Sequence, residues 1–339
     1  MKIKTKFLLV AFLLIFFIEW KSTIITTKKR RPDPFPDKKA EAAYNSLNCS
    51  IHGWGRRRKP AIVLDGFLFN GEFDILKIRL SELDEVVDFF VLLEATMTFS
   101  QTPKYTTSFF ESSDVFFNVW RNKLVLKLVN NLPADLSPYF GTEGFIRSKL
   151  KEAFIETANS PNLTKIDPAD IIVVVSDVDE VPCSAKLAWL KFCDIPNSEL
   201  PARMELENFY YYNFLWKKKK TWTGGPHAGK LSSMIKNEWD PNMLRFSKAN
   251  ADVWKPCGWH MSYFMSAVEV SNKIMSFSHS EYNKQPFIDV SYITQKMKAG
   301  EDLFGRDGEE LLRASPSSEF LPLTVTNNRD YYRHFLEIA

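Results

Sequence analysis

From residue 60 onward, short apolar runs alternate with segments in which apolar residues recur at helical spacing. The run at 171–175 holds five consecutive β-branched residues and is the clearest buried strand. Short apolar strands separated by helices indicate an α/β protein with a mainly parallel sheet covered by helices on both faces. We therefore expect strands at 61–64, 86–93, 124–129 and 171–175, and helices at 73–83 and 143–158.

The N-terminal residues are typical of a membrane-targeting signal. Three lysines in residues 1–6 precede twelve apolar residues at 7–18, and Glu19, Trp20 and Lys21 follow them. A full bilayer span needs about 20 apolar residues, so the run has only the length of a signal-peptide core. No small-residue cleavage pattern follows, which favours an uncleaved anchor in a thin secretory-pathway membrane over a cleaved peptide. We predict a cytoplasmic tail at 1–6, a signal-anchor transmembrane segment at 7–20, a stalk at 21–59 and a catalytic domain at 60–339.

Two tripeptides favour a lumenal location for most of the chain. Asn48 and Asn162 each stand two residues before a serine or threonine, the pattern of a glycosylation acceptor. The segment at 28–59 is polar, contains three prolines and ends in a basic run at 56–59, as expected of a solvated tether. The alternative for its basic runs is a patch that binds a membrane surface or nucleic acid.

Composition narrows the function classes. The chain has 44 basic and 41 acidic residues, and a net charge of +3 is too small to indicate a nucleic-acid partner. Aromatic residues make up 14% of the chain and supply a large core. Four cysteines exclude a disulfide framework but allow one or two bridges. Cys183 and Cys193 flank a helix-like segment and could bridge in an oxidising lumen, and Cys49 is either free or paired.

Four carboxylates follow the predicted strands: Asp65, Glu94, Asp177 and Asp179. In α/β sheets, ligands bind outside the carboxyl ends of the strands. Two carboxylates spaced by one residue can share Mg²⁺ or Mn²⁺, which usually adds waters and the oxygens of a substrate phosphate. The alternative is a charged turn that caps a helix beginning near Ser184.

Two enzyme classes use such a site. In a nucleotide-sugar glycosyltransferase, the metal neutralises the diphosphate that leaves the sugar. An aspartyl-phosphate phosphohydrolase is the weaker interpretation. That class has a second aspartate two residues after the nucleophilic one, whereas Asp65 is followed by Gly66 and Phe67. A non-catalytic sugar-binding membrane protein is the third possibility.

Segments at 65–80, 91–104, 176–182, 210–216, 258–264, 277–283 and 302–308 contain motifs in a fixed order. From about residue 62 to the C-terminus, these motifs resemble glycosyltransferase family 17. The resemblance implies a GT-A-like fold and an inverting transfer of GlcNAc from UDP-GlcNAc to the central β-mannose of an N-glycan acceptor. It also implies Mn²⁺ (or Mg²⁺) as cofactor and a single-pass type II protein of the Golgi membrane with a lumenal catalytic domain.

The same resemblance suggests roles for the site residues. Asp179 is the first choice as metal ligand, and Asp177 contacts either the metal through water or the donor ribose. His260 is a candidate metal ligand or phosphate contact, and Glu180 lies behind the metal or at a helix N-terminus. The nucleotide pocket is expected to be bordered by Asp65, Glu72 and Glu94, with Arg147 either at a diphosphate oxygen or on a solvated helix face.

An inverting transfer also needs a general base for the acceptor hydroxyl. Glu281 and Glu238 are the candidates, with Glu72 behind them. The aromatic residues at 209–212, with Trp216 and Trp222, either stack on sugar rings or form a plain aromatic strand, and 217–220 is expected to be a solvated loop. The chain departs from the animal members at Met261 and Tyr263, where they carry cysteines, so any bridge made there is absent.

Overall fold

The computed structural model describes residues 47–104, 115–211, 215–236, 238–247, 256–314 and 321–336. Within these ranges no helix has the length and apolar character needed to cross a membrane. The predicted anchor at 7–20 and the greater part of the predicted stalk lie outside the described residues.

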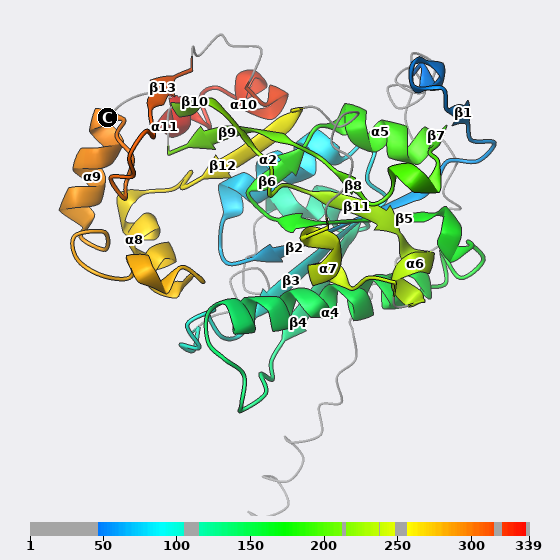
Figure 1. The fold of residues 1–339 in the computed structure, drawn as a ribbon, viewed down its shortest axis with the longest axis horizontal. Helices are drawn as coiled ribbons and strands as arrows, with labels where there is room; N and C mark the ends of the chain where they lie inside the picture. The colour runs from blue at the N-terminus through cyan, green and yellow to red at the C-terminus, as the bar shows by residue number, and fades with distance from the viewer. Residues whose placement is uncertain are drawn as a thin grey trace, which may run out of the picture.

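A six-stranded sheet forms the centre of the molecule (Figure 1). Its first four strands are parallel, and its last two run antiparallel to their neighbours. The prediction of an α/β protein is confirmed, and the sheet predicted to be mainly parallel has four parallel strands followed by two that alternate in direction. In spatial order the strands are β4 (Leu124–Val129), β3 (Phe89–Ala95), β2 (Ile62–Phe69), β5 (Ile171–Asp177), β11 (His227–Lys230) and β8 (Ala202–Arg203).

A second sheet of five strands was not predicted from the sequence. Its strand β12 (Gly258–Ser262) pairs parallel with β9 (Leu206–Tyr210) and antiparallel with β6 (Glu180–Pro182), so residues far apart in the chain meet in this sheet. A two-stranded sheet pairs β1 (Gly55–Arg56) with β7 (Cys193–Asp194). The five strands are, in spatial order, β13 (Leu311–Arg313), β10 (Leu215–Trp222), β9 (Leu206–Tyr210), β12 (Gly258–Ser262) and β6 (Glu180–Pro182).

The helices agree with the apolar periodicity where that signal is strong. The prediction of a helix at 73–83 is confirmed as α2, and the helix predicted at 143–158 begins earlier, at Phe140. Three of the shorter helices begin at a polar cap; at one of them, the hydroxyl of Ser266 and Glu269 form a capping box. The helices are α2 (Phe73–Leu83), α4 (Phe140–Ala158), α5 (Ser184–Phe192), α6 (Leu231–Ile235), α7 (Pro241–Arg245), α8 (Ala267–Ser276), α9 (Val290–Ala299), α10 (Leu323–Asn327) and α11 (Arg333–Leu336).

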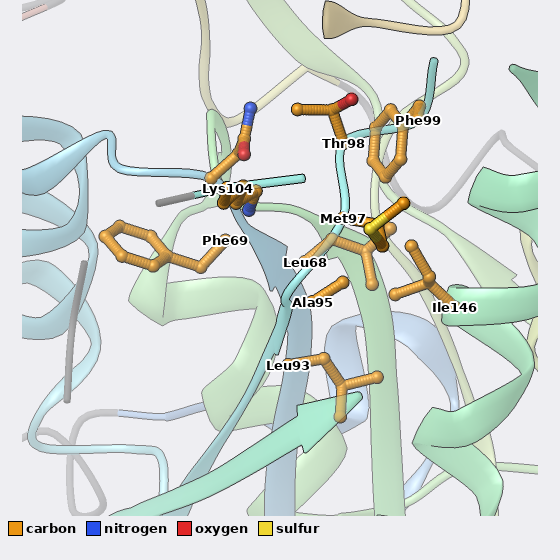
Figure 2. Close-up of a pocket in the computed structure, with 10 residues that line it drawn as sticks. Leu68, Phe69, Leu93, Ala95, Met97, Thr98, Phe99, Lys104 and Ile146 are labelled. Atoms are coloured by element: carbon orange, nitrogen blue, oxygen red, sulfur yellow. The ribbon is translucent and has the colours of Figure 1, made fainter. Parts of the chain in front are cut away.

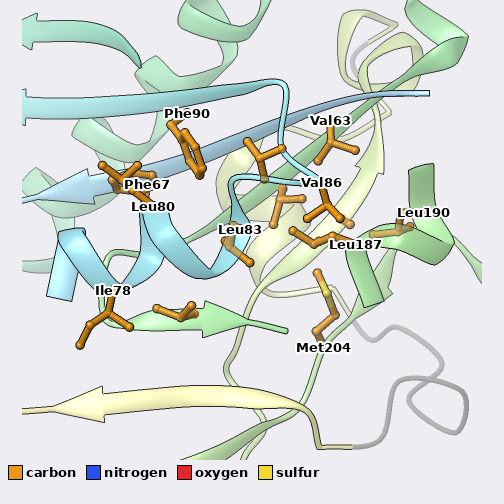
Figure 3. Packing of buried hydrophobic residues seen from close by; sticks show 14 of the residues in the cluster. Val63, Phe67, Ile78, Leu80, Leu83, Val86, Phe90, Leu187, Leu190 and Met204 are labelled. Atoms are coloured by element: carbon orange, nitrogen blue, oxygen red, sulfur yellow. The ribbon is translucent and has the colours of Figure 1, made fainter. Parts of the chain in front are cut away.

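The six-stranded sheet buries both of its faces. Val63 and Phe67 of β2 pack with residues of α2 and α5 on one face (Figure 3). Leu64 and Leu68 pack with residues of α4 and α6 on the other. Because successive residues of a strand face opposite sides of the sheet and both sides are buried, these strands are mainly apolar along their length. Gly66 keeps α4 close, because a Cβ there would lie 2.3 Å from the ring of Phe154.

Two disulfides connect distant segments. Cys49 bonds to Cys193, and Cys183 bonds to Cys257. The bridge between Cys183 and Cys193 suggested by the sequence is wrong, because the nine-residue helix α5 separates the two by about 13 Å. The first disulfide and the buried Trp54 fix residues 47–59 onto the domain, so this end of the predicted stalk is packed.

Candidate active site

The Asp-Val-Asp-Glu segment, residues 177–180, lies where the chain passes from one large sheet to the other. β5 of the six-stranded sheet ends at Asp177, and β6 of the five-stranded sheet begins at Glu180. Asp177 is in register with Leu68, and Glu180 is in register with His260. The two large sheets therefore meet at these four residues. β5 extends two residues past its predicted end at 175, and the helix predicted to begin near Ser184 is confirmed, although no aspartate side chain caps it.

A buried arginine holds the backbone of this segment. Arg79 of α2 donates to both carboxylate oxygens of Asp65, at 2.8 and 2.6 Å. The same guanidinium donates to the carbonyl oxygens of Asp177 at 3.0 Å and Glu180 at 2.8 Å. Asp65 lies inside β2 rather than at its end, and neither side chain is exposed. The predicted place of Asp65 at a strand end is therefore wrong, and both oxygens of its carboxylate accept from Arg79.

Two further arginines surround Asp177. Arg147 of α4 donates to its Oδ1 at 3.0 Å, and Arg245 of α7 donates to its Oδ2 at 2.9 Å. Burial raises the pKa of Asp177, but Arg245 and Arg147 lower it further, so the net pKa lies well below the ordinary value. The carboxylate is therefore ionised, with each oxygen accepting a guanidinium hydrogen bond. Arg147 is buried rather than solvated, and it also pairs with Glu143.

Glu180 is the most enclosed carboxylate of the segment. Both of its oxygens accept from Arg245, at 2.6 and 2.7 Å, and Trp222 of β10 donates to Oε1 at 2.7 Å. Burial raises the pKa of Glu180 in spite of the opposing charge of Arg245. With its oxygens occupied, Glu180 positions Arg245 and Trp222.

Asp179 belongs to a separate charged group. Lys273 of α8 donates to its Oδ2 at 3.0 Å and lies 3.4 Å from Oε1 of Glu72. The same ammonium lies over the ring of Tyr263, 6.0 Å from its centroid. Burial lowers the pKa of Lys273, but Asp179 and Glu72 raise it to a net value above the ordinary one. Lys273 is therefore a permanent cation shared by two carboxylates.

His260 lies in β12 beside this group. Its ring stacks on Trp222 with centroids 4.1 Å apart, Nδ1 lies 3.0 Å from Oδ1 of Asn208, and Nε2 lies 3.1 Å from Oγ of Ser262. Burial lowers the pKa of His260 to about 4, although Asp179 opposes the shift. The imidazole is neutral near pH 7, the state that a metal ligand needs. Both nitrogens already have protein partners.

The other predicted residues divide between interior and surface. Glu94 is buried near the end of β3. The pocket beside this strand end has a volume of about 10 Å³, room for about one water molecule (Figure 2). Glu281 is exposed and pairs with His279 at 2.8 Å, and Glu238 is exposed after α6. Within the described part of the chain, no hydrogen bond or ion pair joins Glu281 or Glu238 to Asp177 or Asp179.

The aromatic and lysine runs differ from the expectation. Tyr210 and Tyr211 are buried and contact Tyr263, so their rings form part of a core cluster. Lys217 lies in β10 rather than in a solvated loop, and it is buried near Asp302 at 3.6 Å and Glu309 at 3.5 Å. The loop prediction is therefore wrong. The side chain of Trp216 and all of Tyr212 lie outside what the structure describes.

Sequence reasoning named Arg147 among the basic residues of the site but missed Arg245 and Lys273. Arg245 and Lys273 lie on short helices 68 and 94 residues from the aspartates they bind. No local pattern distinguishes them from other basic residues. The capping box at Ser266 predicts only where α8 begins, not that Lys273 turns toward Asp179.

The formal charge of the site suits one divalent cation. Two ion-pair groups each have one carboxylate more than cations: Glu143, Asp177 and Glu180 with two arginines, and Glu72 and Asp179 with Lys273. Among the residues that the structure describes, no three His, Cys, Asp or Glu side chains are placed to hold a metal ion together. The site therefore fits an ion held by one or two carboxylates and by substrate oxygens.

Known proteins resemble the chain over most of its length. Rat (Rattus norvegicus) and mouse (Mus musculus) proteins named beta-1,4-mannosyl-glycoprotein 4-beta-N-acetylglucosaminyltransferase are 22% identical over 309 residues, which cover 83% of this chain and 55% of theirs. The human (Homo sapiens) protein of that name is 22% identical over 307 residues. The chain spans about half the length of these relatives. The sequence model of the family described as glycosyltransferase family 17 matches residues 7–314. The chain therefore belongs to that family and is a glycosyltransferase.

Proposed function

We propose that this glycosyltransferase transfers GlcNAc from UDP-GlcNAc to the β-mannose of an N-glycan, with inversion. The observation that carries the proposal is the charged junction after β5, where Asp177 and Asp179 meet basic residues of three helices. It lies at the carboxyl end of a parallel strand, where α/β sheets bind ligands. The names of the rat, mouse and human relatives support GlcNAc as the sugar and mannose as the acceptor.

The side chains at the junction suit a leaving diphosphate. Arg147, Arg245 and Lys273 provide positive charge, and the carboxylate of Asp177 fixes the positions of the two arginines. Mn²⁺ or Mg²⁺, when bound, would add charge to neutralise the diphosphate, with Asp179 and Glu72 as its protein ligands. The acceptor hydroxyl still needs a general base. Glu281 and Glu238 stay predictions for that role.

Burial of Asp65 argues against the hydrolase alternative. A phosphohydrolase of that class needs a nucleophilic carboxylate that can reach a phosphate ester. Arg79 occupies both oxygens of Asp65, and the side chain has no exposed surface.

The expected location is the lumenal side of the Golgi membrane. Disulfides such as Cys49–Cys193 persist in oxidising compartments. Asn48 and Asn162 are both exposed, as glycan acceptors must be. Anchoring through residues 7–20 stays part of the proposal. Alkaline extraction of membranes from expressing cells tests the anchor, and N-glycosidase treatment tests the two glycan acceptors.

The function is tested by donor binding and product analysis on the purified chain. UDP-GlcNAc is titrated calorimetrically with Mn²⁺ and with EDTA, and an N-glycan acceptor is then analysed by mass spectrometry for an added GlcNAc. Asp179→Asn should abolish donor binding. Asp170→Asn is the matched control, since this aspartate precedes β5 and is 60% exposed. If the folded chain binds no UDP-GlcNAc, the assignment of this donor is wrong. If it binds UDP-GlcNAc but transfers no GlcNAc to the glycan, the assignment of an N-glycan acceptor is wrong.

A further inference from the structure

We propose that Lys273 is an exchangeable internal cation: a divalent metal ion binds between Asp179 and Glu72 only by displacing the Lys273 ammonium. The displaced ammonium then pairs with the diphosphate of the donor, a step that rests on the proposed function. Metal and nucleotide binding are therefore coupled through one lysine.

The geometry around Lys273 supports the exchange. Its Nζ lies 3.0 Å from Asp179 and 3.4 Å from Glu72, two carboxylates carried by different segments of the chain. Glu72 is fixed by its second oxygen, Oε2, which accepts from the backbone nitrogen of Asn70 at 2.8 Å. Both carboxylates thus point at one position, which a cation already occupies.

The charges favour a divalent ion at that position. Two carboxylates and one ammonium leave one negative charge uncompensated, whereas two carboxylates and a divalent ion are balanced. Asp177 and Glu180 are less suited to a metal, because guanidinium groups engage all four of their oxygens. An arginine fork binds carboxylates through several fixed hydrogen bonds, whereas an ammonium is a point charge on a flexible stem that can move away.

The displaced lysine explains why the metal and the donor would cooperate. An ammonium that loses both carboxylates in a partly buried site is costly unless another anion replaces them. The face of Tyr263, 6.0 Å from Nζ, offers only weak compensation. A diphosphate restores a full charge partner, so UDP should tighten Mn²⁺ binding, and Mn²⁺ should tighten UDP binding by the same factor.

The test measures Mn²⁺ binding directly, from the electron paramagnetic resonance signal of free Mn²⁺ in solutions of the purified full chain. Lys273→Met removes the internal cation. It should bind Mn²⁺ about tenfold more tightly than wild type when UDP is absent. UDP should then tighten Mn²⁺ binding less than it does in wild type. Adding Glu72→Gln or Asp179→Asn to Lys273→Met should weaken Mn²⁺ binding again.

Lys296→Met is a closely matched control. Lys296 pairs with Glu301 at 2.7 Å and lies 5.6 Å from the ring centroid of Tyr292, and its side chain is 23% exposed against 20% for Lys273. This variant should bind Mn²⁺ as wild type does. Lys273→Arg, which keeps the charge and adds hydrogen bonds, should weaken Mn²⁺ binding and covers the case in which Lys273→Met does not fold.

Equal or weaker Mn²⁺ binding by folded Lys273→Met overturns the proposal, as does an unchanged effect of UDP. If Lys273→Met does not fold, Mn²⁺ binding by Lys273→Arg at wild-type strength overturns it instead. Loss of Mn²⁺ binding in Asp179→Asn with no effect of Glu72→Gln overturns the assignment of Glu72. These readouts need no sugar transfer, so a chain that shows the exchange but modifies no N-glycan refutes the proposed acceptor and leaves the exchange intact.

Discussion

At the scale of single residues, Asp65 and Arg79 form a fully buried ion pair behind the Asp-Val-Asp-Glu segment. Asp65→Asn removes the charge that balances a fully buried guanidinium, so the free energy of unfolding should fall by about 3–5 kcal/mol. Denaturant unfolding measures the loss. Asp170→Asn breaks the pair of Asp170 with Arg57, in which the aspartate is 60% exposed, and should cost no more than about 1 kcal/mol.

Donor affinity separates this structural role from the predicted one. If Asp65 bordered the nucleotide, Asp65→Asn would weaken UDP-GlcNAc binding in the folded fraction and leave stability nearly unchanged. The buried pair predicts the reverse. A stable Asp65→Asn variant with weakened donor binding would therefore contradict the role derived from Arg79.

The same residues show what the sequence predicts about the site. Asp177 and Asp179 could be identified because a run of β-branched residues ends immediately before them, and strand ends are where ligands bind. Their partners Arg147, Arg245 and Lys273 come from three helices, and the inward turn of each side chain depends on tertiary packing. Patterns within a segment contain no information on such pairing.

At the scale of elements, Gly258 controls how β12 lies against β6. Its φ is +102°, and a Cβ there would lie 2.3 Å from the carbonyl oxygen of Val181 and 2.7 Å from the nitrogen of Cys183. Gly258→Ala should therefore cost about 3 kcal/mol or more, because backbone strain and overpacking act together. Gly305→Ala also has a positive φ, +63°, but meets nothing within 4 Å, so about 1 kcal/mol is expected.

Denaturant unfolding of the two glycine variants checks the comparison. Because β12 carries His260 next to Glu180, Gly258→Ala should also weaken UDP-GlcNAc binding, whereas Gly305→Ala should not. Equal losses of stability in both variants would show that the close contact between Gly258 and β6 does not add to the cost of the Gly258→Ala substitution.

The elements also divide into those that local pattern predicts and those it does not. The strands at 124–129 and 171–177 and the helix at 73–83 have strong apolar periodicity and lie at or near their predicted places. The five-stranded sheet was missed because most of its strands are short and because it joins segments from 180 to 313. Its strand β10 includes four consecutive lysines, a composition that indicates a loop when pairing with β9 and β13 is unknown.

At the scale of the whole molecule, the two large sheets each contain a buried histidine whose protonation opposes folding. His227 lies in β11 of the six-stranded sheet, with Nδ1 2.7 Å from the carbonyl oxygen of Gly225, and His260 lies in β12 of the five-stranded sheet. Burial lowers the pKa of each imidazole from 6.5 to about 4. Both rings therefore stay neutral in the folded protein under conditions that protonate them in the unfolded chain.

This difference predicts how global stability depends on pH. Between pH 6.5 and about 4, these two histidines bind more protons in the unfolded chain than in the folded one. The free energy of unfolding should therefore decrease as the pH is lowered, by up to about 1.4 kcal/mol per pH unit for each histidine. Asp177 acts in a separate window, since its lowered pKa removes stability only below its ordinary value of 3.8. Denaturant unfolding from pH 4.5 to 7 measures the slope, which His227→Gln and His260→Gln should each reduce. A free energy of unfolding that stays constant or rises as pH falls through this window would show that neither histidine is held neutral by the fold.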